Sequence, residues 1–218
     1  FAVFSLTMSD TRTIQAPVSA ISRHRIGTDG DGVTTLVVLH SCPLRCRWCL
    51  NTQTWREGSA FREMTPVQLL STVRVDDLYF QATGGGITFG GGEPALRSRF
   101  ISSFRSICPP LWKINIETSL NVPVEHLERL LPVIDEFVID IKDMNPLIYR
   151  EYTGMDNARV IENLKLIVCA GKADRCLIRI PLIPGYNTDD DRARSIAGLE
   201  TLGFTRFDKF EYKTDINK

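Results

Sequence analysis

The chain has 218 residues, of which 43% are hydrophobic and 24% charged, a composition typical of a soluble globular domain with a buried core. Its 26 acidic and 26 basic residues balance, so the charge indicates neither a nucleic acid nor an anionic membrane as a partner. No apolar run approaches the ~20 residues that a membrane span requires.

Strand-like and helix-like segments alternate along the sequence, which is typical of an α/β fold with a mainly parallel sheet. Residues 33–40 form an apolar run expected of a buried strand. Thr65, Pro66 and Gln68 predict the start of a helix with a capping box. Further strands are expected at residues 87–89, 113–117, 137–142, 177–182 and 207–213, and helices at residues 97–107, 124–131, 158–170 and 188–203.

Several expected strands combine one apolar and one polar face. In residues 113–117, Ile114 and Ile116 point to one side, and Asn115 and Glu117 to the other. A flat parallel sheet covered by helices would be apolar on both faces. A curved sheet whose polar face lines a cavity resolves this conflict. We therefore predict a partial (β/α)6 barrel with the last helix missing.

Three cysteines directly follow the first of these strands, where an α/β barrel has its active site. Cys42, Cys46 and Cys49 lie within eight residues. A structural zinc site nearly always has four protein ligands, whereas three thiolates on a four-iron cluster leave one iron open for a substrate. The spacing favours a [4Fe–4S] cluster. A zinc site with His40 as fourth ligand and a chance grouping of thiols are the alternatives.

The remaining cysteines indicate the compartment. Cys108, Cys169 and Cys176 form no close-set pair, and we expect them to be reduced thiols of a cytoplasmic protein. Residues 1–20 are expected to be a disordered leader, and residues 21–218 a single domain.

A glycine-rich turn follows the second strand in the sequence Gly90-Gly91-Gly92-Glu93-Pro94. Glycines at the end of a strand let backbone groups approach a ligand closely, and the adjacent carboxylate can hold an amino group. The spacing matches neither a dinucleotide fingerprint nor a phosphate loop. A tight turn without a ligand is the alternative.

Charged residues end the later strands. Glu117 can bind a hydroxyl group or a cation, or cap the following turn. Asp140 and Lys142 project from one face of their strand and can hold a ligand or pair with each other. Arg179 can hold a carboxylate or form an internal ion pair.

Together these motifs resemble those of the radical SAM superfamily. Its cluster motif is matched by Cys42-x-x-x-Cys46-x-x-Cys49 with Trp48, and its GGE motif by Gly91-Gly92-Glu93. Within the superfamily the chain is similar to the activases of glycyl radical enzymes from about residue 24 to residue 213. The similar segments are residues 29–33, 84–94, 117–119, 140–142, 152–157 and 183–186.

The resemblance implies an anaerobic oxidoreductase that reductively cleaves S-adenosylmethionine (SAM) at a [4Fe–4S] cluster and abstracts a hydrogen from a glycine of a partner glycyl radical enzyme. A flavodoxin- or ferredoxin-type protein is the implied electron donor. The resemblance assigns Cys42, Cys46 and Cys49 to the cluster as the catalytic metal ligands. It assigns contacts with SAM to Trp48, Gly91, Gly92, Glu93, Glu117, Asp140, Lys142, Arg179 and Lys213.

Individual roles follow from the same resemblance. Gly91, Gly92 and Glu93 are expected to hold the amino group of SAM, Lys142 and Asp140 its carboxylate and ribose, and Trp48 its adenine. A monovalent cation, found in some members of the family, is expected near Glu117, Thr118 and Asp140.

The sequence departs from the family pattern at four points. Residues 29–34 lack the proline and arginine of an Asp-Gly-Pro-Gly-x-Arg motif, Glu117 replaces an aspartate, and Lys213 replaces a histidine. The terminal helix and the ferredoxin insert of some activases are absent. Two other functions are alternatives: a radical SAM enzyme acting on a small molecule or another peptide, and a non-catalytic zinc-binding module.

Overall fold

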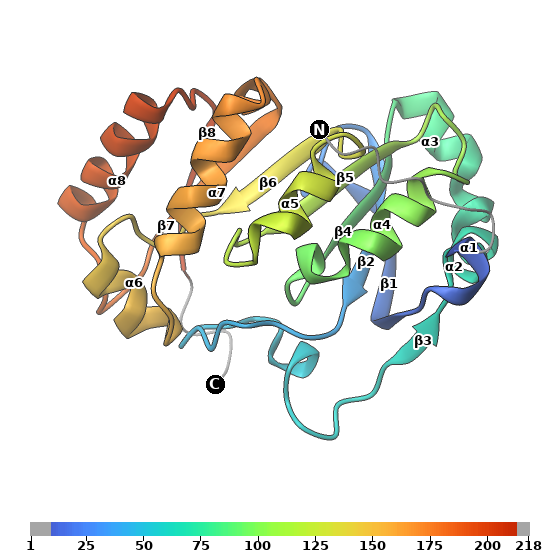
Figure 1. Cartoon of the computed structure of the whole chain (residues 1–218), viewed down its shortest axis with the longest axis horizontal. Helices are drawn as coiled ribbons and strands as arrows, with labels where there is room; N and C mark the ends of the chain where they lie inside the picture. Colours follow the sequence, from blue (N-terminus) through green and yellow to red (C-terminus); the bar gives the residue numbers. More distant parts are fainter. Residues whose placement is uncertain (1–9, 213–218) are drawn as a thin grey trace.

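The computed structural model describes residues 10–212, which form one eight-stranded sheet flanked by helices (Figure 1). The strand order is β3-β1-β2-β4-β5-β6-β7-β8. The last six strands of this order are parallel: β2 (Val33–Leu39), β4 (Gly86–Gly91), β5 (Lys113–Thr118), β6 (Glu136–Asp140), β7 (Cys176–Leu182) and β8 (Phe207–Glu211). The predicted partial (β/α)6 barrel is confirmed.

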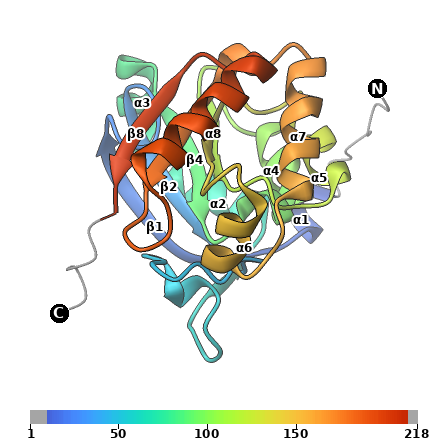
Figure 2. The same cartoon turned by 90° about the vertical axis from the view of Figure 1, so that its left-hand side faces the viewer.

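Helices cover the convex face of the sheet (Figures 1 and 2). They are α2 (Pro66–Val73), α3 (Asp77–Thr83), α4 (Ser98–Arg105), α5 (Val124–Leu130), α6 (Pro146–Thr153), α7 (Ala158–Cys169) and α8 (Asp189–Leu202). Short 3-10 helices are η1 (Thr52–Thr54), η2 (Arg74–Asp76), η3 (Pro94–Arg97) and η4 (Ala173–Arg175). The core lies between the sheet and the helices. There the ring centroid of Phe89 in β4 lies 5.7 Å from that of Phe104 in α4. Among residues 10–212, no helix has the length and apolarity to cross a bilayer.

Local signals set the helix ends as predicted. Thr65 caps α2 with the expected capping box, in which its hydroxyl accepts from the backbone of Gln68. Thr188 caps α8 in the same way, and Gly203 ends it with a φ of 109°. Helices α3 and α6 were not predicted.

The predicted boundary at residue 20 is wrong. Residues 10–20 belong to the fold, because they contain α1 (Asp10–Thr13) and the first part of β1 (Ala16–Ile26). Ala16 and Val18 are buried. Strand β1 pairs antiparallel with both β2 and β3 (Arg62–Met64), and its polar second half concealed it in the sequence. Residues 1–9 lie outside the described range.

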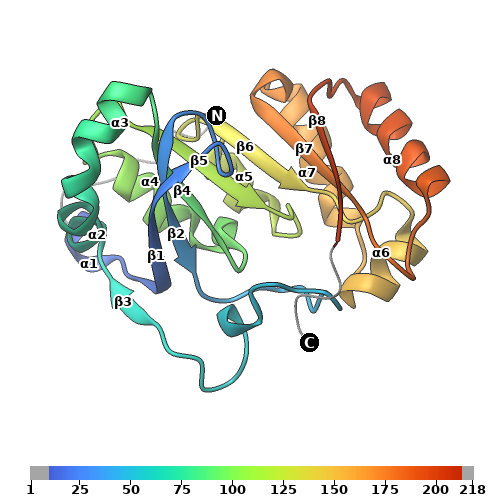
Figure 3. The ribbon, with the colours of Figure 1, turned by 180° about the vertical axis from the view of Figure 1, so that it is seen from behind.

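Figure 3 shows the concave face of the sheet from behind. At the carboxyl edge of the parallel strands, the loop of residues 40–61 runs from β2 toward α6 (Figure 1). Two backbone hydrogen bonds hold the loop to α6: from Arg45 N to Thr153 O at 2.9 Å and from Arg47 N to Tyr152 O at 3.1 Å. The three cysteines are therefore fixed across the mouth of the barrel.

Candidate active site

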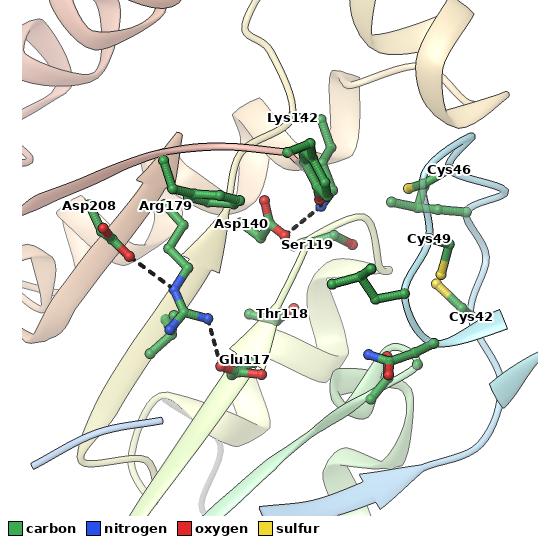
Figure 4. A pocket seen from close by; sticks show the side chains of 18 residues that line it. Cys42, Cys46, Cys49, Glu117, Thr118, Ser119, Asp140, Lys142, Arg179 and Asp208 are labelled. Carbon is green, nitrogen blue, oxygen red and sulfur yellow. Dashed lines mark hydrogen bonds and ion pairs between the residues drawn. The ribbon is translucent and has the colours of Figure 1, made fainter. Parts of the chain in front are cut away.

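A pocket of about 390 Å³ lies at this edge, between the cysteine loop and the parallel strands (Figure 4). It brings together ten of the predicted site residues: Cys42, Cys46, Cys49, Gly91, Gly92, Glu117, Thr118, Asp140, Lys142 and Arg179. Residues that the sequence did not single out also line it, namely Leu44, Leu50, Asn51, Ser119, Val138, Asp208, Phe210 and Tyr212. Lys213 lies outside the described residues. The volume falls within the range of small-molecule and cofactor sites.

The three cysteines are free and half-buried. Figure 4 shows the side chains of Cys42 and Cys49 pointing toward each other, with Cys46 on the same loop. Burial raises the pKa of Cys42 to about 12 and that of Cys46 to about 11, so iron binding must displace their protons.

The donor set fits a cluster better than a single ion. Within residues 10–212, no three His, Cys, Asp or Glu side chains are close enough to hold one metal ion. A four-iron cube offers a separate iron to each thiolate, so its ligands need not converge on one point. His40, the candidate fourth zinc ligand, contacts Ser19 and the ring of Phe61, and it is not among the residues lining the pocket.

The tryptophan whose side chain contacts Cys49 is Trp55, and not Trp48, which is expected to contact the adenine of SAM. Trp48 is 39% exposed and does not line the pocket. Trp55 instead donates its indole N–H to Cys49 Sγ at 3.5 Å, and the guanidinium of Arg45 lies 4.7 Å from its ring centroid. Because Trp55 stands outside the cysteine motif, the sequence pattern gave no signal for this contact.

The two glycines of the motif pack against the cysteine loop and the strand before it. A Cβ atom on Gly92 would lie 2.2 Å from Ser41 O, and one on Gly91 would lie 2.4 Å from a side-chain carbon of Val38. Gly91 also has a φ of 98°, which other residues rarely adopt. Asn51 donates to Gly91 O at 3.2 Å. The glycines thus let the loop lie directly on the end of β4.

Glu93, which is expected to hold the amino group of SAM, is not among the residues that line the pocket. Its buried carboxylate accepts from Thr118 Oγ1 at 2.6 Å, from Ser119 N and Oγ at 2.9 and 2.6 Å, and from Ala95 N at 3.1 Å. Burial raises the pKa of Glu93 although these hydrogen bonds oppose the shift. With its oxygens already bonded, Glu93 joins the loops after β4 and β5 behind the pocket wall.

Lys142 and Asp140 form an ion pair at the end of β6. Lys142 also donates to the hydroxyl of Tyr212 at 2.9 Å. Burial lowers the pKa of Lys142, but the interactions with Asp140 and Tyr212 outweigh this effect of burial. The pKa of Lys142 therefore lies well above its usual value. Asp140 Oδ1 is buried without a hydrogen-bond partner, so it is an acceptor directed at a missing donor. This orphaned oxygen in the pocket wall fits a hydroxyl-bearing ligand.

Arg179 stands on the concave face of β7 between two acids (Figure 4). Its NH1 donates to Glu117 Oε1 at 2.7 Å, and its Nε lies 3.3 Å from Asp208 Oδ2. Its NH2 donates to Thr28 O at 2.6 Å. Burial lowers the pKa of Arg179, but the two acids outweigh that effect and raise it. The arginine is therefore a fixed positive charge in the barrel.

Comparison with known proteins decides the family. A family model described as the radical SAM superfamily matches residues 36–195. The Pyruvate formate-lyase 1-activating enzyme of Escherichia coli (strain K12) is 31% identical over 176 residues, which cover 77% of this chain and 68% of that protein. The chain belongs to the radical SAM superfamily, in its family of glycyl-radical-enzyme activases. It is thus an enzyme of the oxidoreductase type, and its superfamily uses a [4Fe–4S] cluster and SAM.

Two further matches describe the relation of this radical SAM protein to others. The (2S)-3-sulfopropanediol dehydratase activating enzyme of Klebsiella oxytoca is 25% identical over 257 residues, covering 84% of this chain and 80% of that protein. Since 257 aligned positions exceed this whole chain, that relative has segments without a counterpart here. The crystal structure of Streptococcus suis SuiB bound to S-adenosylmethionine has a TM-score of 0.63 at 17% identity. It covers 81% of this chain and 40% of SuiB, and it supports the fold alone.

Proposed function

We propose that this radical SAM protein is an activating enzyme that abstracts a hydrogen atom from a glycine of a partner glycyl radical enzyme. Cys42, Cys46 and Cys49 hold the cluster, and the observation that carries the proposal is that they line one pocket together with Asp140 and Lys142. What the cluster supplies when bound is one electron, whose transfer to SAM breaks a carbon–sulfur bond to give methionine and a 5′-deoxyadenosyl radical.

The charged residues of the pocket orient SAM. Lys142 stays protonated beside Asp140 and suits the carboxylate of the methionine portion. Asp140 Oδ1, which lacks a partner, suits a ribose hydroxyl. The backbone at Gly91 and Gly92 faces the same pocket, and the polar groups there can receive the amino group.

The surrounding residues limit access of water to this chemistry. Leu44, Leu50, Val138 and Phe210 supply apolar surface around the polar groups. Such apolar surface helps to keep bulk water out of the pocket while the substrate enters from the mouth. The position of the pocket at the edge of the sheet suits an extended glycine-bearing segment of a partner protein.

The electron must come from outside the chain. A one-electron donor protein of the flavodoxin or ferredoxin type is the proposed reductant. Each turnover consumes one electron and one SAM, and the hydrogen removed from the partner glycine forms the new C–H bond of 5′-deoxyadenosine.

The experiment that tests the proposal uses anaerobic, reconstituted protein with SAM, dithionite and a candidate glycyl radical enzyme. We expect a glycine-centred radical in the electron paramagnetic resonance (EPR) spectrum of the partner, and one 5′-deoxyadenosine formed per radical. The proposal would be contradicted if the protein cleaved SAM but took the hydrogen atom from a small molecule and formed no radical on any glycyl radical enzyme. That result would support the alternative of a small-molecule radical SAM enzyme.

A further inference from the structure

The three side chains expected to hold a monovalent cation are already engaged with other groups. Glu117 Oε1 accepts from Arg179 NH1 at 2.7 Å. Thr118 donates its hydroxyl to Glu93 at 2.6 Å, and Asp140 is paired with the ammonium of Lys142. One oxygen of each carboxylate thus already faces a cationic group, and Asp140 Oδ1 is the buried oxygen of the set that lacks a hydrogen-bond partner. The cation that the family resemblance implies does not fit these residues.

Arg179 is held in place from three directions. Glu117 on β5, Asp208 on β8 and the carbonyl oxygen of Thr28 in the β1–β2 loop all bind its guanidinium. Its side chain and that of Glu117 are each only 24% exposed. A charge bound this way does not swing aside readily, because leaving would break contacts with three separate elements.

The length of Glu117 contributes to this contact. An aspartate, which the family pattern has here, is one methylene shorter and would stop short of the guanidinium at its present position. Glu117 also lies under Gly90, where an added Cβ atom would approach Glu117 Oε2 to 3.0 Å. The glycine therefore leaves room for the longer acid, and the three residues form a matched set.

Electrostatics then disfavour an additional cation. A monovalent ion at Glu117 would stand next to one guanidinium and share the pocket with the ammonium of Lys142, and like charges at such distances repel. Each acidic group that would attract it already has a cationic partner, because Glu117 and Asp208 share Arg179 and Asp140 is paired with Lys142.

We propose that Arg179 takes the place of the alkali-metal cation, so that this chain binds SAM without K⁺ or Na⁺. The inference rests on the proposed function, since it concerns SAM in the same pocket. Arg179 acts here as a positioning residue, which fixes Glu117 and supplies positive charge at the wall that faces the ligand.

The first test needs no variant. The reconstituted protein is titrated with SAM by calorimetry and by the change in the EPR signal of its reduced cluster. One buffer contains only tetramethylammonium as the monovalent cation, and another contains K⁺ as well. We expect the two dissociation constants to agree within about twofold. Binding that is about tenfold tighter with K⁺ would overturn the inference and leave the proposed function standing. A protein that binds no SAM in either buffer would contradict the proposed function itself.

The second test removes the built-in charge. In Arg179→Gln, Glu117 loses its partner, so we expect SAM binding to weaken by about tenfold in tetramethylammonium and to recover in part with K⁺. Arg206→Gln is the matched control, because neither Arg206 nor Glu136, its ion-pair partner at 2.8 Å, lines this pocket. The iron content of both variants confirms that the cluster is retained. If Arg179→Gln weakened SAM binding equally in both buffers, this result would count against the inference.

Discussion

The ammonium group of Lys142 lies 2.9 Å from the hydroxyl of Tyr212, which joins the end of β6 to the residue that follows β8. Tyr212 stands beside Phe210 and Tyr152, with ring centroids 5.5 and 6.2 Å away. The hydroxyl of Tyr212 and the carboxylate of Asp140 both bind the ammonium group of Lys142. The orientation of the Lys142 side chain in the pocket therefore depends on both residues.

Removing that hydroxyl should weaken SAM binding. In Tyr212→Phe, Lys142 loses one acceptor, and a single hydrogen bond of this kind contributes about 0.5–1.5 kcal/mol. We therefore expect a dissociation constant for SAM about two- to tenfold higher, measured by anaerobic calorimetry. Tyr186→Phe is the control, because Tyr186 contacts Tyr152 through its ring and does not line the pocket. Equal effects of the two substitutions would contradict the role of the Lys142–Tyr212 contact.

Glu93 should matter for stability. In Glu93→Ala the hydroxyls of Thr118 and Ser119 and the backbone N–H of Ser119 lose their common acceptor, and buried unsatisfied groups cost about 1–3 kcal/mol. We expect a lower free energy of unfolding in urea by about that amount. Glu93→Gln keeps one oxygen acceptor and should lose less. An unchanged urea midpoint for Glu93→Ala would show that Glu93 does not join the two loops in solution.

The indole of Trp55 should affect the reduction potential of a cluster bound at Cys49. Hydrogen bonds to cluster sulfurs are among the factors that set this potential, and a donor stabilises the more negative, reduced state. Trp55→Phe removes the donor, so the midpoint potential should become more negative by tens of millivolts in an EPR-monitored titration. Trp48→Phe, at an exposed position outside the pocket, should leave it unchanged. A change of the midpoint potential in Trp48→Phe but not in Trp55→Phe would contradict the hydrogen bond from Trp55 to Cys49.

Asp76 should make folding stability depend on pH. It is buried and accepts hydrogen bonds from Arg23 and Thr35, which ties β1 and β2 to η2, and His24 Nε2 lies 3.1 Å from its Oδ1. Burial raises the pKa of Asp76, but the hydrogen bonds from Arg23 and Thr35 outweigh it and leave the pKa below its ordinary value of 3.8. A lowered pKa means that the stabilisation is present above that value and is lost as the pH falls through the folded-state pKa.

Asp76→Asn should therefore be less stable than the unsubstituted chain at neutral pH, with a difference that shrinks below about pH 4. Urea unfolding at several pH values measures it. Asp174→Asn, at an exposed position, is the control and should show no such trend. A difference that stays constant from pH 3 to pH 7 would exclude the carboxylate charge as its cause.

The alternation of strand-like and helix-like segments predicted the parallel strands. The apolar side of Ile114 and Ile116 and the polar side of Glu117 predicted a curved sheet. The sequence also predicted that residues after separate strands meet at one edge. It did not reveal β1, whose Ser22-Arg23-His24-Arg25 stretch looks like a surface loop until Asp76 is placed beside it.

Contacts at the site that span distant residues could not be predicted from the sequence. A motif marks Glu93 as important, but only the structure brings Thr118 and Ser119 to its oxygens. In the same way, Trp55 and Tyr212 belong to no motif, and their contacts with Cys49 and Lys142 depend on how loops lie across the barrel mouth.

Cys42, Cys46 and Cys49 are proposed to hold the cluster at which SAM is cleaved. This assignment is tested by the iron content and the yield of 5′-deoxyadenosine after anaerobic reconstitution, with SAM and dithionite present. We expect a full four-iron cluster and 5′-deoxyadenosine from the unsubstituted chain and from Cys108→Ala, whose cysteine is buried elsewhere. Cys46→Ala should lose both. A Cys46→Ala variant that still cleaves SAM, or a colourless unsubstituted protein that binds one zinc ion, would contradict the account.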